Sequence, residues 1–137
     1  MQETNENTAV SLEEVRERFS HDRFATVNGA VVEAVEDGYA RCSMELNETH
    51  RNALGAVMGG AIFTLADFAF AVASNWNKEP SVSLTASISF LGKAKGSRLI
   101  AEACRIKEGR KTCYYEITIR DELGSQVAHM TSNGFTV

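Results

Sequence analysis

Residues 50–76 read HRNALGAVMGGAIFTLADFAFAVASNW, and this stretch decides the fold. A polar loop ends in Gly59-Gly60, and the run that follows contains neither glycine nor proline. Because that run is rich in Ala, Leu and Phe, it predicts a helix from about Gly60 to about Trp76. The helix would be apolar nearly all round, which is typical of a buried helix. Asp67 is its only charge.

Two features of this predicted helix bear on function. Backbone N–H groups at the start of a helix attract a negatively charged oxygen, and Gly59 and Gly60 have no Cβ to cover them. Asp67 is a carboxylate in an apolar setting, where proteins keep such a group either for hydrogen bonds that fix packing or for chemistry. The residues alone leave both interpretations of Asp67 open.

The spacing of these groups adds a constraint. Gly59 and Asp67 are eight residues apart, which corresponds to about 12 Å along a helix axis. At that distance the carboxylate cannot act on a carbonyl held at the start of its own helix. If both groups serve one reaction, Asp67 must come from a second subunit. The spacing therefore predicts a site shared in a homodimer, most simply one with two-fold symmetry.

The loop and helix together resemble a known family signature. The residues that carry the resemblance are His50, Asn52, Gly55, Met58, Gly59, Gly60, Leu65 and Asp67. The pattern is similar to that of acyl-CoA thioesterases of the phenylacetate-pathway (PaaI-like) type, and it extends over roughly residues 24–137. The resemblance implies an α+β hot-dog fold, in which an antiparallel sheet wraps one long central helix. It also implies protomers that pair into dimers and then into tetramers, with active sites at the protomer interface.

The resemblance implies hydrolysis of the thioester bond of an acyl-CoA. The backbone N–H of Gly59 would hold the carbonyl oxygen as charge develops on it. Asp67 of the partner subunit would act as a general base on water or as a nucleophile, and the sequence does not choose between them. Asn52 would position the carbonyl or the water. Ser83, where the family tends to carry Ser or Thr, would hold the water or steer the carboxylate.

A second group of residues is assigned to binding the substrate. In the resembled family two basic turns, here residues 91–96 and 107–111, flank coenzyme A, so their cations are candidate phosphate contacts. A lysine in a turn is otherwise usually a solvated charge. The substrate-binding set comprises Met58, Gly60, Thr85, Lys93, Lys95, Arg110 and Lys111. Coenzyme A enters only as part of the substrate, and no separate cofactor is expected.

One position departs from the family pattern and keeps another function open. Met58 stands where the family usually has histidine, and a thioether accepts hydrogen bonds only weakly and does not titrate. A non-catalytic acyl-CoA-binding or regulatory protein is therefore the alternative to a thioesterase. A hot-dog dehydratase or hydratase is a weaker alternative, because its paired catalytic histidine and acid are not found here. The acyl group stays open, since Phe63, Phe70 and Trp76 would shape either a pocket or the core.

The rest of the chain reads as a single domain. Residues 1–10 look unstructured and residues 11–137 form the domain, opening with a capping-box helix to about Ser20. Residues 24–46 predict strands with a hairpin at 36–38, and four more strands follow the central helix, as in an α+β domain. In the first of these four, alternating hydroxyls predict one solvated face. They are Ser83, Thr85, Ser87 and Ser89.

Composition excludes several other classes of function. The net charge of −4 on 137 residues argues against non-specific binding to nucleic acid or to a membrane surface. The apolar run is too short to be a transmembrane helix. Three cysteines without a C-x-x-C pair, and a polar start without a secretory signal, predict a reduced cytoplasmic protein. No metal is expected, because the three histidines share no ligand spacing.

Overall fold

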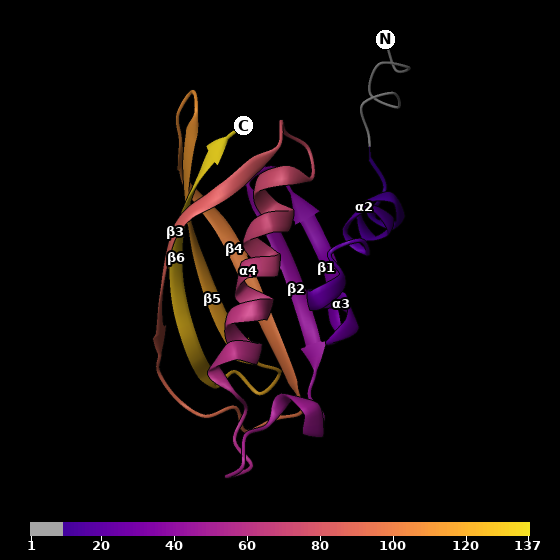
Figure 1. Cartoon of the computed structure of the whole chain (residues 1–137), viewed down its shortest axis with the longest axis vertical. Helices are drawn as coiled ribbons and strands as arrows, with labels where there is room; N and C mark the ends of the chain where they lie inside the picture. The colour runs from indigo at the N-terminus through magenta and orange to yellow at the C-terminus, as the bar shows by residue number, and fades with distance from the viewer. Residues whose placement is uncertain (1–9) are drawn as a thin grey trace.

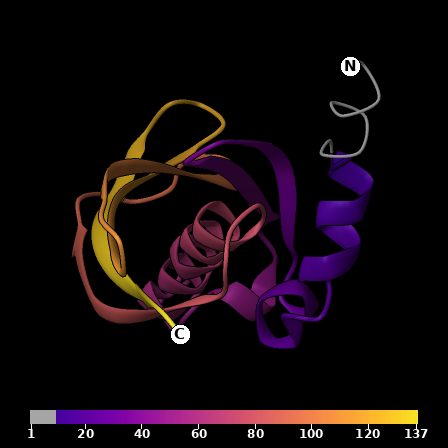
Figure 2. The same cartoon turned by 90° about the horizontal axis from the view of Figure 1, so that it is seen from above.

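The computed structural model describes residues 10–137, in which a curved sheet wraps one long helix (Figures 1 and 2). The elements in chain order are α2 (Leu12–Phe19), α3 (Arg23–Val27), β1 (Ala30–Glu36), β2 (Tyr39–Glu45), the short 3₁₀ helix η1 (Glu48–His50), α4 (Gly59–Asn75), β3 (Ser81–Phe90), β4 (Arg98–Glu108), β5 (Thr112–Asp121) and β6 (Gln126–Thr136). All six strands of this part of the chain form one antiparallel sheet in the order β1-β2-β4-β5-β6-β3. The expected α+β architecture is confirmed.

The long helix α4 forms the centre of the core. Leu65, Ala69 and Val72 are fully buried, and α4 packs against β2, β4 and β5. Burying a side chain the size of Leu65 or Val72 contributes about 1.5–3 kcal/mol to stability. The helix begins at Gly59 and ends at Asn75, within one residue of the predicted bounds. No helix among residues 10–137 is long and apolar enough to cross a membrane.

The predicted capping box starts α2. The Ser11 hydroxyl accepts a hydrogen bond from the Glu14 N–H at 3.1 Å, and the Glu14 carboxylate accepts one from the Ser11 N–H at 3.0 Å. The buried side of α2 places Phe19 edge-on to Phe68 of α4, with ring centres 6.4 Å apart. Residues 1–9 of the expected unstructured start lie outside the described residues. Val10, in contrast, is half-buried against the core.

The prediction of strand from residue 24 is wrong for its first residues, because residues 23–27 form the short helix α3. Asp22 stands at the N-cap position of α3, and Thr26 N–H donates to the Asp22 carbonyl at 3.1 Å. Gly29, with φ of 103°, then turns the chain into β1, a conformation that glycine adopts without steric cost. Five residues are too few for a helical period to be visible in the sequence. The hairpin between β1 and β2 is confirmed.

The strand β3 does not carry its four hydroxyls on one face. Its register with β6 pairs Ser83 with Gly134 and Thr85 with Asn133, so Leu84 is an extra residue that forms a β-bulge. Paired residues in an antiparallel sheet project to the same face. Ser83 therefore faces α4 together with buried Ser132, and the two hydroxyl oxygens lie 3.5 Å apart. Thr85, Ser87 and Ser89 project to the outer face, because one inserted residue reverses the alternation.

Candidate functional site

The start of α4 presents two backbone donors. The Met58 carbonyl accepts the first hydrogen bonds, from the N–H groups of Ala61 and Ile62 at 3.0 and 3.2 Å. Within residues 10–137 the N–H groups of Gly59 and Gly60 have no acceptor. A Cβ on Gly60 would meet no atom within 4 Å, whereas one on Gly59 would approach the Phe90 ring to 3.0 Å. These two donors, at the positive end of the helix dipole, suit a negatively charged oxygen.

Asn52 holds the loop that precedes α4. Its Oδ1 accepts hydrogen bonds from the N–H groups of Leu54 and Ala56, at 2.9 and 3.0 Å. Its own N–H donates to the Ala56 carbonyl at 2.8 Å, and Gly55, with φ of 84°, closes the turn. Because the side-chain oxygen is used within the loop, the Nδ2 amide is the part of Asn52 that a substrate or a water could meet.

His50 is a structural residue of the same loop. It is 2% exposed, its Nδ1 accepts from the Asn47 N–H at 3.1 Å, and its Nε2 donates to the Asn28 carbonyl at 2.7 Å. Those partners require the neutral ring with the proton on Nε2. The His50 carbonyl in turn accepts from the Met58 N–H at 2.8 Å. This histidine therefore ties the loop to the start of α4.

Asp67 lies two turns into α4, on the face that also carries Gly60, Thr64 and Ala71. All four residues are exposed or half-buried, and we call this the open face. Burial raises the pKa of the Asp67 carboxyl, and the neighbouring Asp22 carboxyl raises it further. Within residues 10–137 no hydrogen bond or ion pair engages this carboxylate. Because Asp67 is half-buried, its carboxylate remains accessible at the surface of the protomer.

The chain itself surrounds Asp67 with Phe63, which the sequence singled out, and with residues around α3, which it did not. Asp67 lines a pocket of about 480 Å³ together with Asp22, Arg23, Phe24 and Phe63. Asp22 and Phe24 come from the segment around α3, which packs against α4. No periodic signal marks them, because α3 is short and its neighbours in space are distant in sequence.

Lys93 is brought to the start of α4, and Lys95 lies in the same loop. Lys93 lines a pocket of about 370 Å³ with Arg51, Gly59 and Phe90. Sequence reasoning missed Arg51, although its place beside Asn52 in the loop was a usable signal. The backbone N–H of Lys95 donates to Asp121 at 2.7 Å, while its side chain is exposed. The cations of Arg51 and Lys93 thus lie in the pocket that borders Gly59.

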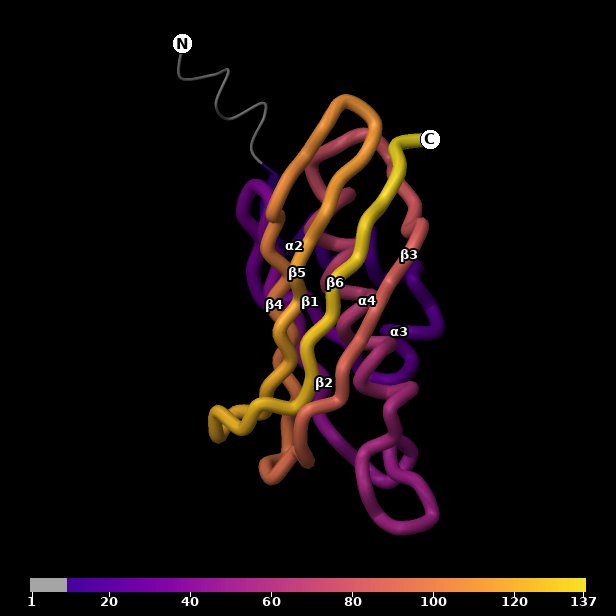
Figure 3. The backbone as a smooth tube through the Cα atoms, turned by 90° about the vertical axis from the view of Figure 1, so that its left-hand side faces the viewer, coloured from indigo at the N-terminus to yellow at the C-terminus, as the bar shows by residue number. Residues whose placement is uncertain are grey.

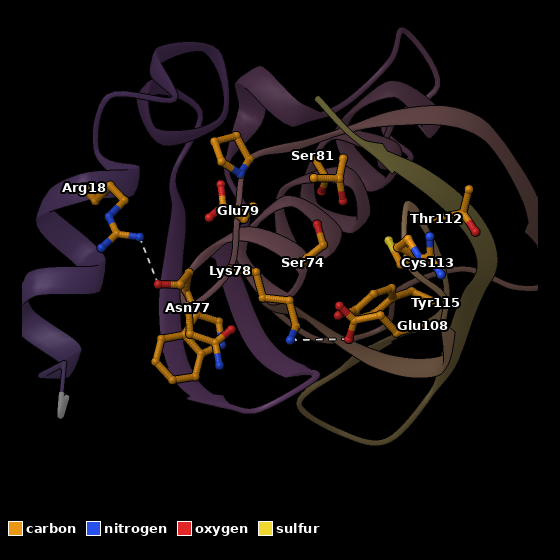
Figure 4. Close-up of a pocket in the computed structure, with 14 residues that line it drawn as sticks. Arg18, Ser74, Asn77, Lys78, Glu79, Ser81, Glu108, Thr112, Cys113 and Tyr115 are labelled. Carbon is orange, nitrogen blue, oxygen red and sulfur yellow. Dashed lines mark hydrogen bonds and ion pairs between the residues drawn. The ribbon is translucent and has the colours of Figure 1, made fainter. Parts of the chain in front are cut away.

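Arg110 and Lys111 lie at the opposite end of the molecule. The β4–β5 hairpin that carries them is near the end of α4, and the loop with Lys93 is near its start (Figures 1 and 3). Arg110 lines a separate pocket of about 670 Å³, in which Lys78 pairs with Glu108 at 3.3 Å (Figure 4). Within one chain the two predicted basic turns therefore do not meet.

The remaining predicted residues are divided by the fold. Ser83 faces α4, whereas Thr85 projects to the outer face of the sheet. Of the aromatic residues considered for an acyl pocket, Phe70 is in the core, edge-on to Tyr115 at 5.5 Å. Trp76 lies at the far end of α4 and donates to the Glu36 carbonyl at 3.1 Å. Phe63 alone of the three lines pockets on the open face.

The chain is similar to several known proteins. A family model described as "Domain of unknown function (DUF4442)" matches residues 19–134. The acyl-coenzyme A thioesterase PaaI of Escherichia coli (strain K12) is 30% identical over 111 residues, which is 80% of this chain and 79% of that protein. The E. coli PaaI structure has a TM-score of 0.81 and covers 93% of this chain and 96% of its own.

Two further solved structures are similar over most of their length. A mutant of the phenylacetic acid degradation protein PaaI from Thermus thermophilus is 30% identical, with a TM-score of 0.78 over 83% of this chain and 98% of that chain. A Streptococcus mutans protein, solved bound to acetyl CoA, is 26% identical, with a TM-score of 0.75 over 80% of this chain and 89% of that chain.

Proposed function

Because the chain carries the DUF4442 domain and belongs to the PaaI-like thioesterase family of the hot-dog fold, we propose that it hydrolyses the thioester bond of an acyl-CoA to a free acid and coenzyme A. The open face of α4 carries the proposal. It carries the Gly60 N–H, which lies beside the Gly59 N–H at the helix start, and the Asp67 carboxylate, and within residues 10–137 none of these three groups has a hydrogen-bond partner. Thioester hydrolysis uses both kinds of group, one for the developing oxyanion and one for water.

In the proposed reaction the N–H groups of Gly59 and Gly60 bind the carbonyl oxygen of the thioester. They become more effective as negative charge develops there, which lowers the barrier. Asp67 of the partner subunit removes a proton from the attacking water, or itself attacks the carbonyl carbon to form an anhydride that water then opens. In either route the carbon–sulfur bond breaks and coenzyme A leaves as the thiol. Asn52 and Ser83 are proposed to position the water and the carboxylate.

A shared site requires a homodimer, and two features of the protomer support one. Small residues on the open face, Gly60, Thr64 and Ala71, permit close approach of a second helix. The strand β3 is a free edge of the sheet, with Val82 and Leu84 half exposed at 50% and 58%, and such edges favour pairing. We propose a two-fold dimer, and by resemblance a dimer of dimers, with Lys93, Lys95, Arg110 and Lys111 as phosphate contacts.

Release of free thiol from a panel of acyl-CoAs tests this function directly. The panel spans acetyl, medium-chain, long-chain and aryl thioesters, and we expect turnover on at least one. The alternative, a non-catalytic acyl-CoA-binding protein, is favoured by Met58, which cannot titrate. Saturable acyl-CoA binding in calorimetry without thiol release would overturn the hydrolase proposal and support this alternative.

Mixed dimers test whether two subunits build one site. We expect Asp67→Asn and Gly60→Val each to be inactive, the second because a branched side chain covers the helix start. Refolded together in equal amounts, the two variants should recover about one quarter of the parent activity. Half of the dimers are then mixed, and one of the two sites in each mixed dimer combines an intact Gly60 with an intact Asp67. Each variant refolded alone is the control. Failure of the mixture to recover activity, with dimers present, would contradict a shared site.

The acidic limb of the pH profile should depend on Asp22. A general base works deprotonated, so activity falls as the pH drops through the raised pKa of Asp67. Asp22→Asn removes the second cause of that shift, so the pKa of Asp67 falls and the limb moves to lower pH. Arg23, the other charged residue that lines this pocket among residues 10–137, stays in place.

The matched control for Asp22→Asn is Glu36→Gln, which removes one carboxylate from an exposed position near the far end of α4. The measurement is kcat/KM against pH for both variants and the parent. An acidic limb that moves equally in both variants would reflect net charge and would exclude a specific effect of Asp22.

A further inference from the structure

Two pockets flank the glycine donors at the start of α4, and they differ in whether cationic side chains line them. One, with Arg51 and Lys93, is lined in part by Gly59. The other, about 400 Å³, lies between α3 and the start of α4 and is lined in part by Gly60. We propose that this second pocket receives the acyl group, and that Phe24 and Met58 set the acyl length that the enzyme accepts. The inference rests on the proposed function and deepens it by naming the substrate class.

The walls of the second pocket are mostly apolar, with Asn28, Thr49 and Thr64 as uncharged polar residues among them. Phe24, Met44, Met58 and Phe63 contribute its large side chains, and Met44 is 1% exposed at its floor. His50 also lines the pocket, but both of its ring nitrogens are engaged by the backbone. Among residues 10–137, no Lys, Arg, Asp or Glu lines this pocket. A carboxylated acyl group would lose hydration there without finding a counter-charge, so the pocket suits uncharged acyl chains.

The order of the two pockets orients the substrate. The thioester carbonyl binds at the N–H groups of Gly59 and Gly60, which lie between the two pockets. The phosphates and pantetheine arm then extend toward Arg51 and Lys93, where cations form charge-assisted hydrogen bonds. The acyl chain extends the other way, past Met58 and Phe63. A pocket of this size is within the usual range for a small-molecule ligand.

Phe24 and Met58 are the adjustable parts of this pocket. Phe24 is 74% exposed and Met58 is 46% exposed, so both can move or be replaced without opening a hole in the core. Phe24 lines this pocket and also the one that holds Asp67, so its ring forms the boundary between the two pockets and limits the length of the first. Met58 is unbranched and flexible, and it fits chains of different shape.

The experiment measures chain-length preference in Phe24→Ala, Phe24→Trp and Met58→Ala, with Val27→Ala as the matched control. Val27 is an exposed apolar residue of the same helix, at 81%, and lies outside both pockets. We expect the two alanine variants to favour longer acyl chains and Phe24→Trp to favour shorter ones. The ratio of kcat/KM for long over short chains should change about tenfold, the value of one or two methylenes in such a pocket.

A readout that does not need turnover accompanies the kinetics. Dissociation constants of short- and medium-chain acyl-CoAs, measured by calorimetry, should shift in the same direction. If thiol release is absent but these constants shift, the proposed function fails and the acyl pocket stands. If Phe24→Ala and Val27→Ala give the same chain-length profile and the same constants, the inference is overturned.

Discussion

Asp67→Asn is expected to lower kcat by about 10³-fold, the scale of removing a positioned acid–base group. Asparagine has the same shape but neither removes a proton nor forms an anhydride, so the loss follows in both versions of the mechanism. Acyl-CoA binding and the dimer should persist, because the substitution changes no volume. Thiol release under saturating substrate is the measurement, with Glu36→Gln as the matched control.

The same substitution should not destabilise the protein. Burial and Asp22 raise the pKa of Asp67, which means that the folded chain disfavours its charged form. The unfolded chain ionises it freely, so at neutral pH this carboxylate opposes folding. Asp67→Asn removes that cost, and the thermal midpoint should stay equal or rise, as expected where function is kept at the expense of stability. Full activity in a well-folded Asp67→Asn dimer would exclude this residue from catalysis.

Asp121→Ala is expected to lower the free energy of unfolding by about 3 kcal/mol, because it strands several buried backbone donors at once. Asp121 is fully buried. One oxygen accepts from the N–H groups of Lys95 and Gly96 at 2.7 and 2.9 Å. The other accepts from Leu123 and Ser125 at 3.1 and 2.8 Å. Urea unfolding measures the change, and Asp121→Asn, which keeps an acceptor oxygen, should lose less.

The Asp121 carboxylate also predicts a pH dependence of stability. Burial alone would raise its pKa, but the N–H groups of Lys95, Ser125 and Gly96 outweigh burial and hold the pKa at about 2. The unfolded value is about 3.9, so the stabilisation is complete above that pH and is lost as the pH falls toward 2. The alanine variant should lack this acid-sensitive part. If parent and variant lose stability in parallel between these values, the prediction is wrong.

This carboxylate links stability to the candidate site. The loop it holds carries Lys93 to the pocket beside Gly59. We therefore expect Asp121→Ala to raise the KM for acyl-CoA and to leave kcat nearly unchanged. The reason is that the loop with Lys93 loses its anchor, while the open face of α4 is untouched. The sequence offered no reason to pick Asp121, since its hydrogen-bond partners Lys95 and Gly96 lie about 25 positions earlier.

The sequence by itself determined the features that depend on neighbouring residues along the chain. The bounds of α4, the free donors at Gly59 and Gly60, and the capping box of α2 follow from helical periodicity and end effects within a few residues. The separation of Gly59 from Asp67 along one helix likewise follows from the helical rise. These local rules also placed the hairpin between β1 and β2.

Only the tertiary structure decided which distant residues meet. It placed Asp22 and Phe24 beside Asp67, and Lys93 beside Gly59. It left Arg110 at the other end of α4. It also turned Ser83 inward through a bulge whose position depends on pairing with β6. Each of these arrangements arises from contacts between segments that the chain order separates, and the energies of those contacts leave no periodic trace in the sequence.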